Sequence, residues 1–162
     1  MMKGVTVRIL ALAMLLSATA ASAQTATLDA RTAQSIVTGC AAHATAKQQS
    51  HSIVVVDLGG DPVAALRMDR NGSGTFDFAM QKAAAVAAWG FPTSGMEEGA
   101  KEVPGFARAP HVVTVPGGVP VWSADGKTRL GGVGVSGEAP ADDAACAEAG
   151  IRAAGLRSSR VR

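Results

Sequence analysis

The sequence predicts a single domain of the α/β class, more closely an α+β sandwich in which helices pack on an antiparallel sheet of about five strands. Two observations indicate this class. Apolar residues recur at helical spacing near both ends of the chain and in its middle, and between these segments lie short β-branched runs separated by turns rich in glycine and proline. Strands joined by short turns and flanked by helices are typical of such a domain.

The first 23 residues have the pattern of a secretory signal peptide. Lys3 and Arg8 come first, an apolar run follows, and the segment ends in Ala-x-Ala at residues 21–23. The apolar run is shorter than the roughly 20 residues that a membrane-spanning helix needs. An uncleaved anchor fits less well, because Ala-x-Ala is a cleavage site. We therefore expect cleavage after Ala23, no stable membrane anchor, and a periplasmic or secreted protein.

The charge of the remaining chain argues against one class of partner. The whole sequence has a formal net charge of +2, and Lys3 and Arg8 supply two positive charges that no acidic residue before Gln24 offsets. The formally neutral remainder lacks the basic surface that nucleic-acid binding requires. We assign residues 24–156 to one domain of ordinary size and residues 157–162 to a basic, disordered tail.

The first helix is expected over about 28–48, where apolar residues follow helical spacing and Thr27 is the N-cap. His43 falls on its apolar face, where a histidine more often packs than binds a ligand.

The continuous β-branched run 52–58 predicts a strand covered on both faces. It is followed by a glycine-rich turn, capped by the Asp57 side chain, and by a return strand over 62–69 that completes a hairpin.

A second helix is expected from about Thr75 to Trp89. It is apolar almost all round, which predicts burial between layers or in a subunit contact, and Lys82 is its exception. The glycine- and proline-punctuated stretch after it, with one short helix over about 94–102, is the longest irregular region. Binding residues tend to collect in such regions.

Three strands of a meander are expected at residues 111–115, 119–122 and 130–137. Gly117 and Gly118 permit either a hairpin turn or the close approach of a ligand to the backbone, and the turn explains them without a ligand. A last helix is expected within residues 139–155. It has proline in its first turn and two aspartates at the positive end of its dipole.

The chain has two cysteines, Cys40 and Cys146, which fall in the first and last expected helices. In an oxidising compartment such a pair predicts one disulfide that closes most of the domain. The alternative is a pair of buried thiols in neighbouring helices. A metal site is not expected from two cysteines without a Cys-x-x-Cys pair.

Several stretches together resemble the GlcG/HbpS family of small haem-binding and glycolate-operon proteins. They are VVVDLGGDPVAALRMD, QKAAAVAA, PGGVPVW and LGGVGVSG, followed by the Asp-rich start of an Ala-Gly helix. The resemblance covers residues 28–156. It implies a profilin-like sandwich that assembles into homo-oligomers, and secreted members of this kind bind haem outside the cytoplasm. Other members are linked only by gene neighbourhood to glycolate, diol or corrinoid metabolism.

The sequence departs from the family at two places. Arg70, Asn71 and Gly72 replace the small residues that usually follow Arg-Met-Asp. The helix that usually reads Lys-Ala-x-Thr-Ala has Ala85 and Val86 where its polar residue would fall. Any role of that threonine in the family is therefore not transferred to this chain.

Haem binding requires an iron ligand, an apolar slot and cations for the propionates. Thr93 lies about where a hydroxyl has been linked to haem iron in a secreted relative, so the resemblance implies it as one candidate. His111 is the other, because imidazole is a strong ligand for iron. Its alternative is an ordinary surface histidine at the start of a strand.

Arg67 and Lys82 are the candidate cations for a carboxylate. The guanidinium of Arg67 suits a propionate or an organic acid, and its alternative is a salt bridge with Asp69 or Asp57. Lys82 alternatively runs its stem along the surface and keeps its charge in water.

These observations favour a non-catalytic protein that captures or buffers haem, with haem as its cofactor. No nucleophile elbow, zinc-protease motif or phosphate loop occurs in the sequence, so an enzyme is not expected. The alternative hypothesis is a protein that binds a small organic acid, or an accessory enzyme, linked to glycolate-type metabolism.

Overall fold

The computed structural model describes residues 27–161, so the expected signal peptide and its cleavage site lie outside the described residues. The elements, in chain order, are α1 (Ala30–Ala46), β1 (Ser52–Val56), β2 (Pro62–Arg67), α2 (Ser73–Trp89), α3 (Thr93–Glu102), the short 3₁₀ helix η1 (Phe106–Arg108), β3 (Gly118–Trp122), β4 (Arg129–Ser136) and α4 (Pro140–Ala153). The predicted α+β class is confirmed. Within the described range, no helix has the length and apolarity needed to cross a membrane.

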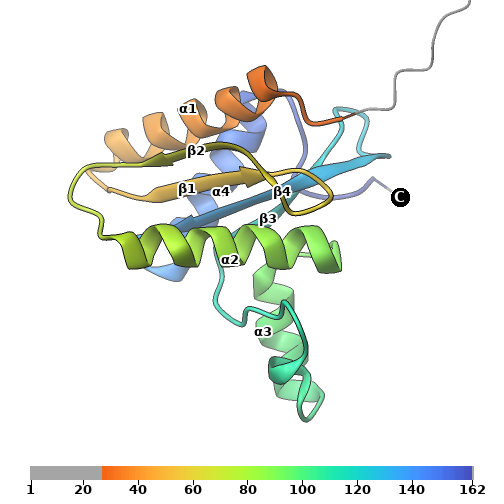
Figure 1. The fold of residues 1–162 in the computed structure, drawn as a ribbon. Coiled ribbons are helices and arrows are strands. Elements are labelled where there is room, and N and C mark those ends of the chain that lie inside the picture. The colour runs from red at the N-terminus through yellow and green to blue at the C-terminus, as the bar shows by residue number, and fades with distance from the viewer. Residues whose placement is uncertain (1–26, 162) are drawn as a thin grey trace, which may run out of the picture.

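The strands form one antiparallel sheet in the order β2-β1-β4-β3. Helices α1 and α4 pack on one face of this sheet and α2 packs on the other (Figure 1). Ile53 and Val55 of β1 belong to the core under α1 and α4, whereas Val54 and Val56 pack with α2, because successive side chains of a strand point to opposite faces. All of β1 is buried, which confirms the prediction of a strand covered on both sides.

The sheet has four strands rather than about five, because residues 111–115 do not form one. His111 has a φ of 59°, which turns the chain where a strand needs an extended backbone. The amide of Val112 then donates back to the carbonyl of Ala109 at 3.3 Å. The segment is an irregular link between η1 and the sheet, and β3 begins only at Gly118.

Glycines in β4 allow α2 to lie directly on the sheet. A Cβ added to Gly134 would be 1.9 Å from the carbonyl oxygen of Ala79, and one added to Gly132 would be 3.0 Å from that of Ala83. Small residues on both elements therefore bring the two backbones together. This contact sets the distance between α2 and β4.

The predicted disulfide between Cys40 and Cys146 is present. The S–S distance is 2.04 Å and the two Cα atoms are 4.7 Å apart, so the bond joins α1 to α4. Both cysteines are fully buried. Next to the bond, Gly150 lets the helices approach, since a Cβ there would be 2.4 Å from the carbonyl oxygen of Ile36.

The two ends of the domain differ in detail from the sequence expectation. Asp29, not Thr27, is the N-cap of α1, and its Oδ1 accepts a hydrogen bond from the amide of Thr32 at 2.7 Å. At the other end, where a disordered tail was expected, Arg157 forms an antiparallel bridge with Trp122. The segment from Arg157 to residue 161 thus lies against the turn between β3 and β4.

Candidate functional site

Lys82 is almost completely buried, with an exposed fraction of 1%. Its Nζ donates to Oδ2 of Asp143 at 2.9 Å and to the carbonyl oxygen of Val135 at 2.9 Å, under the ring of Phe78. The sequence offered a cation for a carboxylate ligand or a charge kept in water, and the burial excludes the second of these. Burial lowers the pKa of Lys82 below 10.5, and the hydrogen bond and charge of Asp143 oppose that shift.

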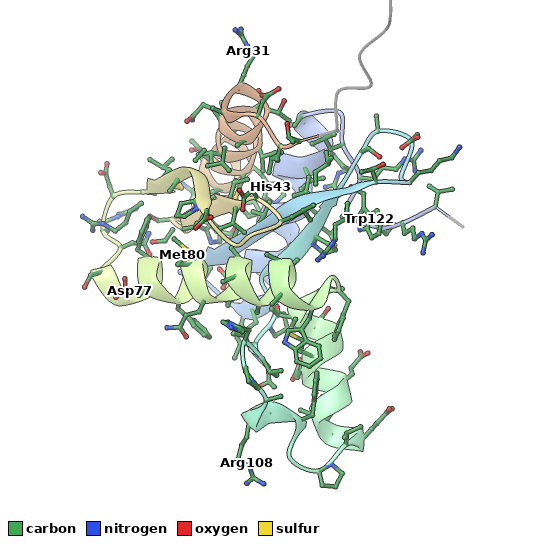
Figure 2. The ribbon with its side chains drawn as sticks, turned by 45° about the vertical axis from the view of Figure 1, so that its right-hand side comes forward. Arg31, His43, Asp77, Met80, Arg108 and Trp122 are labelled. Atoms are coloured by element: carbon green, nitrogen blue, oxygen red, sulfur yellow. A yellow bond between two sulfur atoms is a disulfide. The ribbon has the colours of Figure 1, made fainter. Side chains whose placement is uncertain are left out.

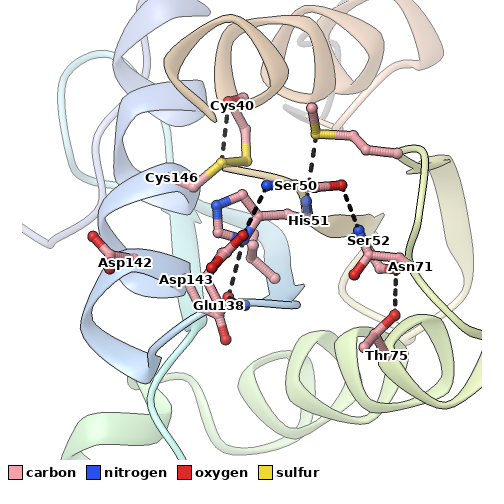
Figure 3. Close-up of polar contacts among 12 residues, drawn as sticks. Cys40, Ser50, His51, Ser52, Asn71, Thr75, Glu138, Asp142, Asp143 and Cys146 are labelled. Carbon is pink, nitrogen blue, oxygen red and sulfur yellow. Dashed lines mark hydrogen bonds and ion pairs between the residues drawn. A yellow bond between two sulfur atoms is a disulfide. The ribbon is translucent and has the colours of Figure 1, made fainter. Parts of the chain in front are cut away.

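The carboxylate of Asp143, in the first turn of α4, contacts three other residues, and Figure 3 shows it beside His51. Its Oδ2 binds Lys82 of α2, while its Oδ1 lies 3.0 Å from Nδ1 of His51 and accepts the amide of Glu138 at 3.2 Å. Because a carboxylate only accepts hydrogen bonds, Nδ1 of His51 carries the hydrogen. His51 is fully buried, and its Nε2 has no hydrogen-bond partner within residues 27–161.

Gly117 and Gly118 do more than form a turn. A Cβ on Gly117 would be 2.7 Å from Nζ of Lys82, and a Cβ on Gly118 would be 2.5 Å from Cγ2 of Thr93. Thr93 is fully buried, and its Oγ1 accepts the amide of Gly118 at 2.9 Å. Two of the four predicted site residues, Lys82 and Thr93, are therefore packed around this glycine pair in the interior.

The other two predicted residues, Arg67 and His111, are exposed and lie outside this interior cluster. Arg67 ends β2, and its Nη1 donates to the carbonyl oxygen of Asn71, so it supports the loop that leads to α2. His111 lies in the link before β3.

Trp89, Phe91 and Phe106 form a surface cluster, called here the aromatic cluster. The ring centres of Trp89 and Phe106 are 5.2 Å apart and those of Trp89 and Phe91 are 6.3 Å apart, both edge to face. The chain has only six aromatic residues, so half of them meet at this place. The indole of Trp89 remains 39% exposed, which leaves an aromatic surface open to solvent.

The aromatic cluster is joined directly to His111. Nε1 of Trp89 donates to the carbonyl oxygen of Pro110 at 3.0 Å, and this carbonyl belongs to the peptide bond that leads into His111. His111 itself has a positive φ of 59°, which is strained for a residue with a side chain. Arg108 extends into solvent from the neighbouring η1 (Figure 2). An apolar ring surface, an imidazole and a guanidinium are thus contributed by one region of the chain.

A family model described as "Haem degrading protein HbpS-like" matches residues 28–152. The chain belongs to the HbpS-like family. The resemblance found in the sequence is therefore confirmed, and it places the chain in a haem-related family. None of the curated proteins compared with the chain matches it.

Solved structures agree with this HbpS-like assignment. A double mutant of HbpS from Streptomyces reticuli has 26% identity and a TM-score of 0.72, covering 88% of this chain and 97% of its own. PduOC in complex with haem has 22% identity and a TM-score of 0.75, covering 83% and 100%. ORFY of Klebsiella pneumoniae has 23% identity and a TM-score of 0.74, covering 83% and 94%. At their lower identity, the last two show the fold alone.

Sequence reasoning did not find four of the residues that build these two regions of the HbpS-like chain: His51, Asp143, Trp89 and Arg108. One signal was present for Asp143. A lysine on an otherwise apolar helix requires a counter-ion when it is buried, and the two aspartates at the start of the last helix were read only as partners of the helix dipole. Nothing in the sequence pattern joined Trp89 to the residue before His111.

Proposed function

We propose that this HbpS-like protein binds haem on the surface formed by the aromatic cluster and His111. The observation that carries the proposal is the hydrogen bond from Trp89 to the carbonyl of Pro110, which holds the peptide that leads into the exposed His111 against a partly exposed tryptophan. Membership of a haem-related family and a fold shared with a haem complex of PduOC support the choice of ligand.

The residues of this surface offer three chemical groups that haem binding uses. The aromatic cluster offers an apolar face, His111 offers a nitrogen ligand, and Arg108 offers a guanidinium for a propionate. Haem would supply an iron centre with a further coordination position. Thr93 fits the role of iron ligand less well, because its oxygen is buried and accepts the Gly118 amide.

Lys82 is likewise a poor partner for a propionate, because its charge is already matched by Asp143 in the interior. Arg67 extends from β2, and its guanidinium holds the loop at Asn71. We therefore assign Lys82 a role in the stability of the fold. We assign the binding of a propionate to Arg108 rather than to Arg67.

The proposed role is capture or buffering of haem outside the cytoplasm by a homo-oligomer. The signal-peptide pattern of residues 1–23 and a disulfide suited to an oxidising compartment support the location. The family description names haem degradation, which is a different outcome for the same ligand. The two are separable: a captured haem keeps its Soret band when a mild reductant and oxygen are added, whereas a degraded haem loses it.

The first experiment is a titration of haemin into the protein that begins at Gln24. We expect a saturable Soret shift at one equivalent or less per chain. His111→Ala should weaken or alter this shift, whereas His43→Gln, which changes a histidine on α1, should leave it unchanged. A shift that survives His111→Ala but is lost in Thr93→Val would overturn our choice of iron ligand. The absence of any saturable shift would remove the proposed function itself.

A further inference from the structure

A hollow lies where the end of α4, the turn between β3 and β4, and the segment after α4 meet, on the side where the C-terminus is marked in Figure 1. Its volume is about 420 Å³, and we call it the C-terminal hollow. It is lined by Ala124, Arg152, Gly155, Leu156, Arg157, Ser158 and Ser159. Among these described residues there is no aspartate or glutamate, so two guanidinium groups set the charge of its wall.

Arg157 is held in place before any ligand arrives. Its backbone exchanges two hydrogen bonds with Trp122, at 2.8 and 3.1 Å. Its Nε also donates to the carbonyl oxygen of Ala124 at 2.8 Å, which fixes the plane of the guanidinium. Within residues 27–161, Nη1 and Nη2 make no hydrogen bond to protein, so the outer fork of a preoriented arginine remains available.

Arg152 comes to the same hollow from the last turn of α4. Its only ion pair within the described chain is with Glu148, at 3.5 Å, and both side chains are largely exposed, so this contact competes weakly for the guanidinium. The partial negative charge at the C-terminal end of α4 is also reduced. The amides of Ala154, Gly155 and Leu156 donate hydrogen bonds to carbonyl oxygens of the last turn, so these carbonyls are not left unpaired.

We propose that the C-terminal hollow binds a small anion that carries a carboxylate or a phosphate group. The fork of Arg157 takes two oxygens of the anion, Arg152 adds a second positive charge, and the hydroxyls of Ser158 and Ser159 add donors. The volume lies within the range of about 300–1,000 Å³ that small-molecule sites occupy. The hollow shares no lining residue with the haem surface proposed above, so the two sites stand or fall separately.

The test measures binding of inorganic phosphate and of malonate to the full domain by calorimetry, as a probe for each anion class. We expect saturable binding of at least one probe. Arg152→Gln and Arg157→Gln should each weaken it about tenfold or more, since each removes a charge-assisted contact. Arg160→Gln is the matched control, because Arg160 lies in the same segment without lining the hollow.

Three results would overturn the proposal: no saturable binding of either probe, an equal loss in Arg160→Gln, or unchanged binding in Arg152→Gln. Arg152→Gln decides the matter if Arg157→Gln fails to fold, because Arg152 makes only the weak contact with Glu148. The Soret shift with haemin should be the same in all three variants. A failed haem titration with intact anion binding, or the reverse, therefore identifies which proposal is wrong.

Discussion

Nζ of Lys82 lies 2.9 Å from Oδ2 of Asp143, and both side chains are at most 3% exposed. The two residues are 61 positions apart, on helices that lie on opposite faces of the sheet. The pair therefore connects the two layers of the sandwich through the end of β4, where Lys82 also binds the carbonyl oxygen of Val135.

Removing one member of this pair should be costly. Asp143→Ala leaves the buried Lys82 ammonium without its counter-ion and the His51 imidazole without its acceptor, and we expect the free energy of unfolding to fall by about 3–5 kcal/mol. The double variant Lys82→Met/Asp143→Leu should lose less than the sum of the single changes. Urea unfolding followed by circular dichroism measures both. Glu97→Ala, which breaks an exposed pair with Lys101, should cost under about 1 kcal/mol. If Asp143→Ala lowered the free energy of unfolding no more than Glu97→Ala does, the argument from burial would be contradicted.

The lowered pKa of Lys82 predicts a pH dependence of stability. Between the folded pKa and 10.5 the unfolded chain binds more protons than the folded chain, so the contribution of Lys82 to the free energy of unfolding rises with pH in that window. Unfolding titrations from neutral pH towards 10.5 should show a more positive slope for the wild type than for Lys82→Met. Lys101→Met, which removes an exposed lysine, should keep the wild-type slope. A Lys82→Met slope equal to that of the wild type would refute the prediction.

Gly117→Ala should disturb the same pair from a different element. Its φ of 125° is unfavourable for alanine, and the new Cβ would be 2.7 Å from Nζ of Lys82. We expect a loss of about 2–4 kcal/mol in the free energy of unfolding, from backbone strain and overpacking together. Gly60→Ala separates the two causes, because Gly60 has a φ of 87° and nothing within 4 Å of an added Cβ. The new Cβ would also be 2.6 Å from the carbonyl oxygen of Val135, so similar losses at the two sites would show that overpacking against Val135 and Lys82 contributes nothing.

His111 should show a conflict between stability and ligand binding. Because its φ is 59°, His111→Gly relieves strain that His111→Ala retains, and the glycine variant should be more stable than the alanine variant by about 1 kcal/mol. Both variants should weaken or alter the Soret shift with haemin. Thermal unfolding and the haemin titration together check the two halves of this prediction. Equal stabilities would mean that the strain is not released, and a retained shift would exclude His111 as the iron ligand.

Trp89→Phe tests whether the tryptophan positions His111. The phenyl ring keeps an aromatic contact with Phe106, while the donor to the Pro110 carbonyl is lost. We expect weaker haemin binding and a changed Soret position with little change in thermal stability. Trp122→Phe is a control at the far end of β3. Unaltered spectra in Trp89→Phe would show that the hydrogen bond has no part in ligand geometry.

Much of the fold follows from local patterns. The β-branched run of β1 indicated a strand buried on both faces, the paired cysteines indicated the bond between α1 and α4, and the side chain of Asp57 does cap its turn by accepting the amides of Gly59 and Asp61. The prediction of a fifth strand at residues 111–115 was wrong, because a valine-rich run is equally compatible with an irregular link. What decides against a strand there is the positive φ of His111, which composition does not reveal.

The candidate site was harder to predict because its contacts join distant segments. Lys82 stood out as a charge on an apolar helix, but its partner could be identified only once α2 and α4 were placed on opposite faces of β4. Thr93 was selected by resemblance, and its burial depends on the close approach of Gly118. Trp89 and His111 are linked by a side chain that binds a backbone carbonyl, and such a contact leaves no periodic pattern in the sequence.

The backbone contact between α2 and β4 has a consequence for both regions at once. Lys82 projects from the middle of α2 and Trp89 ends it, while Gly132 and Gly134 form the floor on which the helix rests. A methyl group added at Gly132 or Gly134 would push the whole of α2 away from the sheet. Lys82 and Trp89 would move with the helix. A change confined to the sheet would thus reach both the interior ion pair and the surface tryptophan.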